Sequence, residues 1–227
     1  MNTDQQLDNT LVIPVDQEHG ALRLVIVLSF IVIWIVAFII FSTAIPNDGF
    51  SLLAVLLGFG CSYLLTTLLE RSLKPRWPSG RVVKLGGDGV KMLQKDKLQQ
   101  QVLSEDPANA VFWQFKVTKG RTRVPKGWLM LACALEFEND YLTVYTFMSA
   151  AQLEAYDMAP FFKKLVGKRK GKSDEDARED LRLAGEQRRL RDAENQRWMF
   201  GAEMTPADFQ TYLSRLKTQF PEWMPVN

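Results

Sequence analysis

Two apolar runs near the N-terminus constrain this chain of 227 residues more than any other feature. The first, ALRLVIVLSFIVIWIVAFIIFSTAI, extends from Ala21 to Ile45 and has no charge after Arg23. The second, FSLLAVLLGFGCSYLLTTLL, extends from Phe50 to Leu69 without a charge. About 20 apolar residues, rising about 1.5 Å each, cross a hydrocarbon core of about 30 Å. Since the letters PNDG between the runs are turn residues, the sequence predicts a transmembrane helical hairpin over residues 21–70. The alternative is one membrane helix followed by a buried helix of a soluble domain.

Basic residues are distributed unevenly around this hairpin. The chain has 28 Lys and Arg residues against 26 Asp and Glu, yet Arg23 is the only basic residue before Glu70. Arg71, Lys74 and Arg76 follow the second run directly. Because short segments rich in Lys and Arg stay in the cytoplasm, we expect both termini to be cytoplasmic. The hairpin then crosses the cell (inner or plasma) membrane twice.

The segments on either side of the hairpin follow from this orientation. A polar N-terminal tail, residues 1–20, precedes the hairpin. A basic juxtamembrane linker, residues 71–80, follows it.

The second run carries small residues at every fourth position: Ala54, Gly58, Ser62 and Thr66. This spacing places them on one face of a helix, where small side chains let another helix approach closely. The face can pack against the first helix of the same chain, or it can form a homo-oligomer. Charged residues and His are absent from the middle of both runs, which argues against a proton relay or an ion pathway.

The apolar pattern changes from helical to alternating at Arg81. RVVKL, a GGDG turn and VKML predict a first β-hairpin, and VFWQFKVT alternates apolar and polar residues. WLMLACALEF and YLTVYTF, separated by the turn residues END, predict a second hairpin. About five antiparallel strands can bury one face if a helix or second sheet covers it. A helix capped by Ser149, which Pro160 kinks or splits, follows the last strand, so we expect one β domain over residues 81–166.

The remaining chain has two different characters. Residues 167–200 are dense in charge and poor in aliphatic residues, so they predict a solvated helix capped by Ser173, or else a linker. Residues 201–227 contain TPADFQTYLSRLKTQF, in which Thr205 caps an amphipathic helix. The expected fold is an α+β membrane protein. An N-terminal two-helix transmembrane hairpin is followed by a small antiparallel β domain with C-terminal helices.

Several of these features together resemble bacterial membrane proteins with a PH-like cytoplasmic domain of the YcxB-like type. They are the two membrane helices, the basic residues after them, a sheet that opens with VKLGGDGVKM, and a last hairpin that continues into YTFMSAAQLEAYDMAPFFKKL. The resemblance covers roughly residues 20–166. It implies a PH-like fold, opened by a strand with a D-G turn and closed by a Ser- or Thr-capped helix, and a role without catalysis. The charged segment and the last helix depart from that pattern, which leaves open which helix closes the domain.

Few residues suit catalysis or metal binding. A hydrolase triad needs a base, and the single His, His19, lies in the polar tail. Cys61 and Cys133 neighbour neither a second Cys nor a His, so a zinc site and a disulfide framework are not expected. The GGDG letters lack the Lys-Ser/Thr and the helix of a phosphate loop. We therefore expect no enzyme activity, no cofactor and no metal. Since the basic residues lack interleaved stacking aromatics, we also expect no nucleic acid partner.

A basic stretch between two strands, KVTKGRTRVPKGW, is the best candidate for a binding surface. It contains Lys116, Lys119, Arg121, Arg123 and Lys126 and no acidic residue. Together with the basic residues after the hairpin, it can contact anionic lipid headgroups, at about 1 kcal/mol for each Lys or Arg near the surface. A solvated loop that serves only topology is the simpler interpretation.

Two functions of different class are therefore open. The first is a membrane-anchored, non-enzymatic interaction module whose PH-like domain contacts anionic lipid or a protein partner. The second is a structural or regulatory subunit of a larger membrane complex, assembled through the small-residue face and the charged helix.

Overall fold

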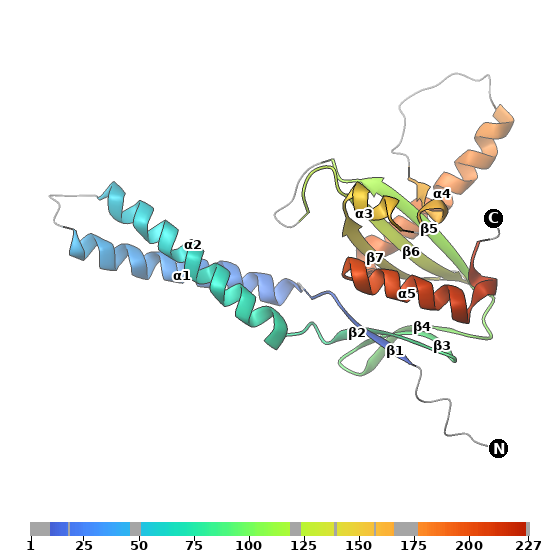
Figure 1. Cartoon of the computed structure of the whole chain (residues 1–227), viewed down its shortest axis with the longest axis horizontal. Helices are drawn as coiled ribbons and strands as arrows, with labels where there is room; N and C mark the ends of the chain where they lie inside the picture. Colours follow the sequence, from blue (N-terminus) through green and yellow to red (C-terminus); the bar gives the residue numbers. More distant parts are fainter. Residues whose placement is uncertain are drawn as a thin grey trace, which may run out of the picture. The chain divides into compact units, whose positions relative to one another are not determined.

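The computed structural model describes residues 10–17, 19–45, 51–118, 124–138, 140–156, 158–165 and 177–225 (Figure 1). The chain forms two compact units. The helical unit is Asp16–Ser79, and the globular unit combines Met1–Val15 with Gly80–Asn227. The helical unit is thus inserted into the sequence of the globular unit. The protein is an α+β protein with two long apolar N-terminal helices and antiparallel sheets.

Two helices form the helical unit: α1, Gly20–Ala44, and α2, Leu52–Arg76. Both predicted helices are present. Ser51 caps α2, because its hydroxyl accepts a hydrogen bond from the Ala54 amide at 3.2 Å. The two helices pack against each other along their length.

The second helix is longer than its apolar run predicts. It continues past Leu69 into residues 71–80, which the sequence assigned to a linker, and ends at Arg76. Glu70 and Lys74 form an i,i+4 ion pair of 2.8 Å, and basic side chains are favourable in the last turn of a helix. These residues therefore extend the helix instead of ending it, and the linker is shorter than predicted.

A short strand precedes the helices, which corrects the prediction of a polar tail over residues 1–20. β1, Leu11–Val15, pairs antiparallel with β2, Arg81–Gly86. Ile13 and Val15 are buried, and Pro14 between them is exposed on the edge of the sheet, where a missing amide is tolerated. The short apolar run LVIPV within this otherwise mostly polar segment is thus a strand, and two of its side chains face the core.

β1 and β2 belong to a four-stranded sheet, sheet A, in the order β1-β2-β3-β4. β3 is Gly89–Gln94 and β4 is Lys97–Leu103. The predicted GGDG hairpin is confirmed: Gly89 has a φ of 128°, and a Cβ there would lie 2.1 Å from the Val102 carbonyl oxygen. The D-G turn does not open the sheet, however, because β1 precedes it.

Sheet B has the order β8-β5-β6-β7-β9. Its long strands are antiparallel: β5, Asn109–Lys116, β6, Leu129–Phe137, and β7, Asp140–Met148. The hairpin predicted from WLMLACALEF and YLTVYTF is confirmed as β6 and β7. Two short parallel strands add the edges: β8, Lys163–Lys164, and β9, Ala202–Glu203.

Both faces of sheet B are apolar, which is why β6 reads as an almost continuous apolar run. Side chains that face sheet A include Phe112, Leu131, Cys133, Leu135, Leu142 and Val144. Side chains on the opposite face include Val111, Trp113, Met130, Ala132 and Ala134. Each face therefore needs its own cover.

The first face is covered by α5, Pro206–Gln219, which lies between the two sheets (Figure 1). Thr205 caps α5 as predicted, with its hydroxyl accepting from the Asp208 amide at 3.2 Å. Phe209 and Tyr212 are among its fully buried residues. The sequence left open which helix closes the domain, and α5 is the long helix that fills the core shared by both sheets.

The second face is covered by α4, Ala177–Phe200, on the other side of sheet B (Figure 1). Of the two interpretations of residues 167–200, helix is correct for this part. Ser173, its predicted cap, lies outside the described residues. Leu190 and Ala193 are buried against the sheet, so three-residue spacing lets a charged helix present a narrow apolar stripe.

The helix predicted after Ser149 is much shorter than expected. A capping box between Ser149 and Gln152 starts α3, Ala150–Glu154, and a 3-10 turn, Ala159–Phe161, contains Pro160. Proline lacks the amide that a continuing helix needs, so the chain turns there. A second 3-10 turn, Pro221–Trp223, follows α5.

The bounds 81–166 predicted for the β domain also need correction. β1, α4, β9 and α5 all lie outside that range, yet all belong to the globular unit. The predicted range stops too early because β9 and α5 follow a charged segment that carries almost no apolar signal.

Candidate functional site

The outer surface of the helical unit is apolar and exposed. Both helices are long and apolar enough to cross a membrane, and few of their side chains are buried. On α1 the exposed apolar residues include Leu24, Val27, Leu28, Ile31, Val32, Ile35, Val36, Ile39 and Ile40. On α2 they include Leu52, Leu53, Leu56, Leu57, Phe59, Leu64, Leu65 and Leu68. A helix in the core of a soluble protein would bury such side chains, and these helices expose them.

The inner face of α2 consists of the four small residues singled out in the sequence. Ala54, Gly58, Ser62 and Thr66 are the buried residues of this helix. A Cβ on Gly58 would lie 3.2 Å from the backbone nitrogen of Phe38 on α1. The four residues thus face α1 of the same chain.

A hydrogen bond between the helices reinforces this packing. The Ser62 hydroxyl donates to the Phe30 carbonyl oxygen of α1 at 2.7 Å. The rings of Phe30 and Phe59 meet edge to face, with centroids 5.3 Å apart.

The basic residues after the second apolar run lie on the last turns of α2. Arg71 and Arg76 are exposed, and Lys74 is half-buried beside Glu70. Arg76 donates to the Ser72 hydroxyl at 3.2 Å. These side chains are held on a helix surface, so they do not form a flexible basic loop.

The predicted basic loop is described only at its two ends. Lys116 ends β5 and Lys126 lies in the turn before β6, and both are exposed. Lys119, Arg121 and Arg123 lie outside the described residues. The ends come together because the Gly127 amide donates to the Val117 carbonyl at 3.0 Å, which extends the pairing of β5 and β6. The structure assigns these lysines to the globular unit and Arg71, Lys74 and Arg76 to the helical unit.

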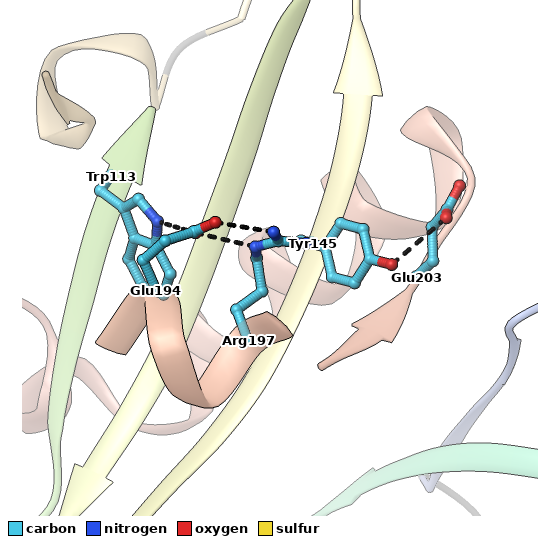
Figure 2. A network of polar contacts seen from close by, with 5 residues as sticks. All are labelled: Trp113, Tyr145, Glu194, Arg197 and Glu203. Carbon is cyan, nitrogen blue, oxygen red and sulfur yellow. Dashed lines mark hydrogen bonds and ion pairs between the residues drawn. The ribbon is translucent and has the colours of Figure 1, made fainter. Parts of the chain in front are cut away.

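A polar network that the sequence analysis missed joins α4 to sheet B (Figure 2). The Trp113 indole of β5 donates to Glu194 Oε2 at 2.9 Å. Arg197 holds the same carboxylate with two hydrogen bonds, Nε to Oε2 at 2.8 Å and Nη2 to Oε1 at 2.7 Å. The Arg197 guanidinium also lies 4.6 Å from the centre of the Tyr145 ring on β7. Tyr145 in turn donates to Glu203 of β9 at 3.4 Å.

The network explains how α4 can bury a charge. The Arg197 side chain is 8% exposed and the Glu194 side chain 20%, so both are largely removed from water. Desolvation of a charge is costly unless it is paired and hydrogen-bonded, and here Trp113 satisfies a further acceptor. The arrangement fixes the position of α4 on the sheet.

Further polar contacts attach the middle of α4 to the sheet. Lys163 of β8 and Glu186 form an ion pair of 2.7 Å, and Arg189 pairs with Glu136 of β6. Burial is the main reason that the pKa of Tyr141 is raised to about 12, and contact with Glu136 raises it further. Tyr141 therefore keeps its proton and donates to Glu136 at neutral pH.

Burial keeps two titratable groups of the core neutral. Burial raises the pKa of the Cys133 thiol and of the Tyr212 hydroxyl, so neither ionises near neutral pH. Within the described part of the chain, no group of three or more His, Cys, Asp or Glu side chains is placed to hold a metal ion. The His19 ring meets the Trp77 ring edge to face, with ring centroids 5.6 Å apart.

Comparisons of the chain with protein-family models, with curated proteins and with solved structures find no match. What this protein does is therefore inferred from its own residues.

Proposed function

We propose that this protein is a membrane-anchored, non-enzymatic interaction module. The hairpin of α1 and α2 crosses a membrane twice and holds the globular unit at one surface. One observation carries the proposal: β1, before the hairpin, and β2, after it, are neighbouring strands of sheet A. Both ends of the hairpin must therefore lie on the same side of a membrane, because one folded sheet receives them.

The exposed apolar surface of the hairpin supports the membrane assignment. In water this surface would cost about 25 cal/mol for each Å² of apolar area. A hydrocarbon layer removes that cost. The Lys and Arg residues at the end of α2 then favour the cytoplasmic side of the cell membrane, with both termini there.

The globular unit is proposed to act as a PH-like module that contacts anionic headgroups. Basic residues in both units support contact with headgroups. Lys116 and Lys126 are exposed and close to each other at one end of sheet B, and Arg71, Lys74 and Arg76 lie where α2 would leave the membrane. Anionic lipid attracts such residues within about a Debye length of the surface.

The alternative role, a subunit of a larger complex, was expected to depend on the small-residue face of α2, and that face is already covered. The small-residue face that would have assembled the complex packs against α1 of the same chain. Part of the charged helix is likewise packed against sheet B. A protein partner then has to bind elsewhere on the globular unit.

Hydrogen exchange of the full chain in lipid nanodiscs tests the headgroup contact. One sample contains phosphatidylcholine alone and the other adds phosphatidylglycerol, each over a salt series. Anionic lipid should slow exchange in peptides that contain Lys116 and Lys126, and the effect should fade as salt rises. The double variant Lys116→Gln/Lys126→Gln should lose it, whereas Lys217→Gln on α5 should keep it. Equal exchange in both lipids would overturn the headgroup role and leave a protein partner.

A further inference from the structure

Three consecutive large apolar side chains end α4. Trp198, Met199 and Phe200 are 69%, 61% and 51% exposed. The exposed residues of the same helix from Arg188 to Asn195 are charged or polar. Exposed apolar side chains rimmed by polar residues mark sites of interaction with proteins or membranes when they form a patch.

The patch adjoins the strands that connect to the helical unit. The Arg81 guanidinium donates to the carbonyl oxygens of Phe200 at 2.6 Å and Gly201 at 3.2 Å. Arg81 begins β2, and it lies opposite Val15, the last residue of β1. The end of α4 and both connecting strands therefore meet at one end of the globular unit.

The connections at this end are short. Residues 16–19 separate β1 from α1, and residues 77–80 separate α2 from β2. Such a connection spans at most about 18 Å when fully extended. If α2 crosses a membrane, the covalent chain keeps this end of the globular unit near the surface where α2 emerges.

Basic side chains accompany the patch. Lys95 and Lys97 are exposed in and beside the turn between β3 and β4, with Asp96 between them. The turn is fixed next to the connection, because the Lys95 amide donates to the Gly80 carbonyl at 2.7 Å. Its lysines can meet headgroup phosphates while the apolar side chains reach deeper.

We propose that Trp198, Met199 and Phe200 insert into the interfacial layer of the same membrane and attach the globular unit to it a second time. The inference rests on the proposed membrane anchoring. Trp is favoured at the interface between headgroups and acyl chains, and apolar side chains of surface helices lie about 5–10 Å into that boundary. The partner of the patch is thus a lipid surface.

Spin labels on the full chain in liposomes measure this insertion. Single cysteines replace Met199, Asn195 one turn earlier on α4, and Leu56 on α2, all exposed positions, in a Cys61→Ala background. Buried Cys133 stays, and a sample with no added cysteine confirms that it takes no label. Oxygen, which concentrates in lipid, and a water-soluble nickel chelate then report the depth of each label.

If the patch inserts, the labels at 56 and 199 should be accessible to oxygen and protected from the chelate. The label at 195 should show the reverse. A label at 199 that the chelate reaches while the label at 56 lies in lipid would overturn the insertion and leave the membrane anchor intact. If neither reagent reaches the label at 199 and its spectrum shows spin–spin broadening, the patch would contact a second copy of the chain, and the insertion would be overturned. A label at 56 open to the chelate would overturn the membrane anchor and the insertion together.

Discussion

The helical unit and the globular unit use small and large side chains in opposite ways. α2 buries Ala54, Gly58, Ser62 and Thr66 and exposes leucines. The globular unit buries its large residues, such as Trp113 and Phe209, and exposes mainly polar ones, apart from the end of α4 and a few residues of β1 and β4.

This inversion fits the proposed membrane anchoring, in which the two units lie in different solvents. In water, burial of large apolar side chains supplies the stabilisation, so they fill the core. In hydrocarbon that driving force is absent, and helices associate through close backbone approach and polar contacts such as the bond from Ser62 to Phe30. The same chain therefore carries two sets of packing rules, and substitutions should have opposite effects in the two units.

The largest expected effect is that of a large-to-small substitution in the globular core. Phe209→Ala removes a fully buried ring between the sheets and should lower the free energy of unfolding by about 3–5 kcal/mol. Leu68→Ala, at a 61% exposed position of α2, should leave it nearly unchanged. Chemical denaturation of the full chain in micelles, followed by tryptophan fluorescence, compares the two. Equal losses would contradict the inversion.

The next effect concerns the buried charge under α4. Arg197→Met leaves Glu194 without its bidentate partner in a largely buried position and should cost about 3 kcal/mol. Arg188→Met, at an exposed position of the same helix, should cost little. A double variant, Arg197→Met with Glu194→Gln, should recover part of the loss. The same denaturation assay measures all three, and no recovery would mean that the two side chains act independently.

A small-to-large substitution should harm the helical unit. Gly58→Leu forces a side chain against the backbone of Phe38 and should destabilise the hairpin by about 1–3 kcal/mol. Gly60→Leu meets nothing within 4 Å and should be tolerated. Thermal unfolding followed by helical circular dichroism in micelles distinguishes them. If both glycines tolerate Leu, the two helices do not pack as described.

Loss of a helix cap should have a smaller effect. Thr205→Ala removes the acceptor for the Asp208 amide at the start of α5 and should cost about 1 kcal/mol. Thr205→Ser keeps the hydroxyl and should cost less. Hydrogen exchange of the first turn of α5 shows whether the stability is lost there. Unchanged exchange in Thr205→Ala would mean that the Thr205 hydroxyl does not stabilise the helix.

The smallest effect depends on pH. The hydrogen bond from Lys91 is the main reason that the pKa of Asp88 lies below its ordinary value. The ionised carboxylate therefore favours the folded state above its unfolded pKa, and this contribution disappears as pH falls through the folded pKa. Asp88 is largely exposed, so Asp88→Asn should cost only about a few tenths of a kcal/mol at neutral pH and nothing in strong acid. If Asp88→Asn still lowers the stability in acid, Asp88 would stabilise the turn by something other than its charge.

Sequence patterns predicted those elements whose signal is local. The two apolar runs, the Gly89 hairpin and the Thr205-capped helix each carry their own periodicity or cap. β4 does not, because Val102 is its one buried residue, and the signal of β1 is weak because the run LVIPV is only five residues long and contains a proline. Such strands form because neighbouring strands accept their backbone hydrogen bonds.

The polar network of α4 lay beyond prediction for a different reason. Trp113 and Glu194 are 81 positions apart, and their bond depends on α4 covering the outer face of sheet B. The spacing of Leu190, Ala193 and Arg197 at three and four residues was the only local signal. The basic residues were visible in the sequence, but their division between two units was not.

Cysteine labelling tests most directly whether the helices form a membrane hairpin inside one sheet. Single cysteines replace Val12 on β1, Ala44 at the end of α1 and Ser214 on α5, all exposed, in a Cys61→Ala background. A membrane-impermeant maleimide is added to intact spheroplasts and to inverted vesicles. In a membrane hairpin inside one sheet, positions 12 and 214 should react only in inverted vesicles and position 44 only in spheroplasts. Reaction of positions 12 and 214 from opposite sides, or of all three from one side, would contradict it.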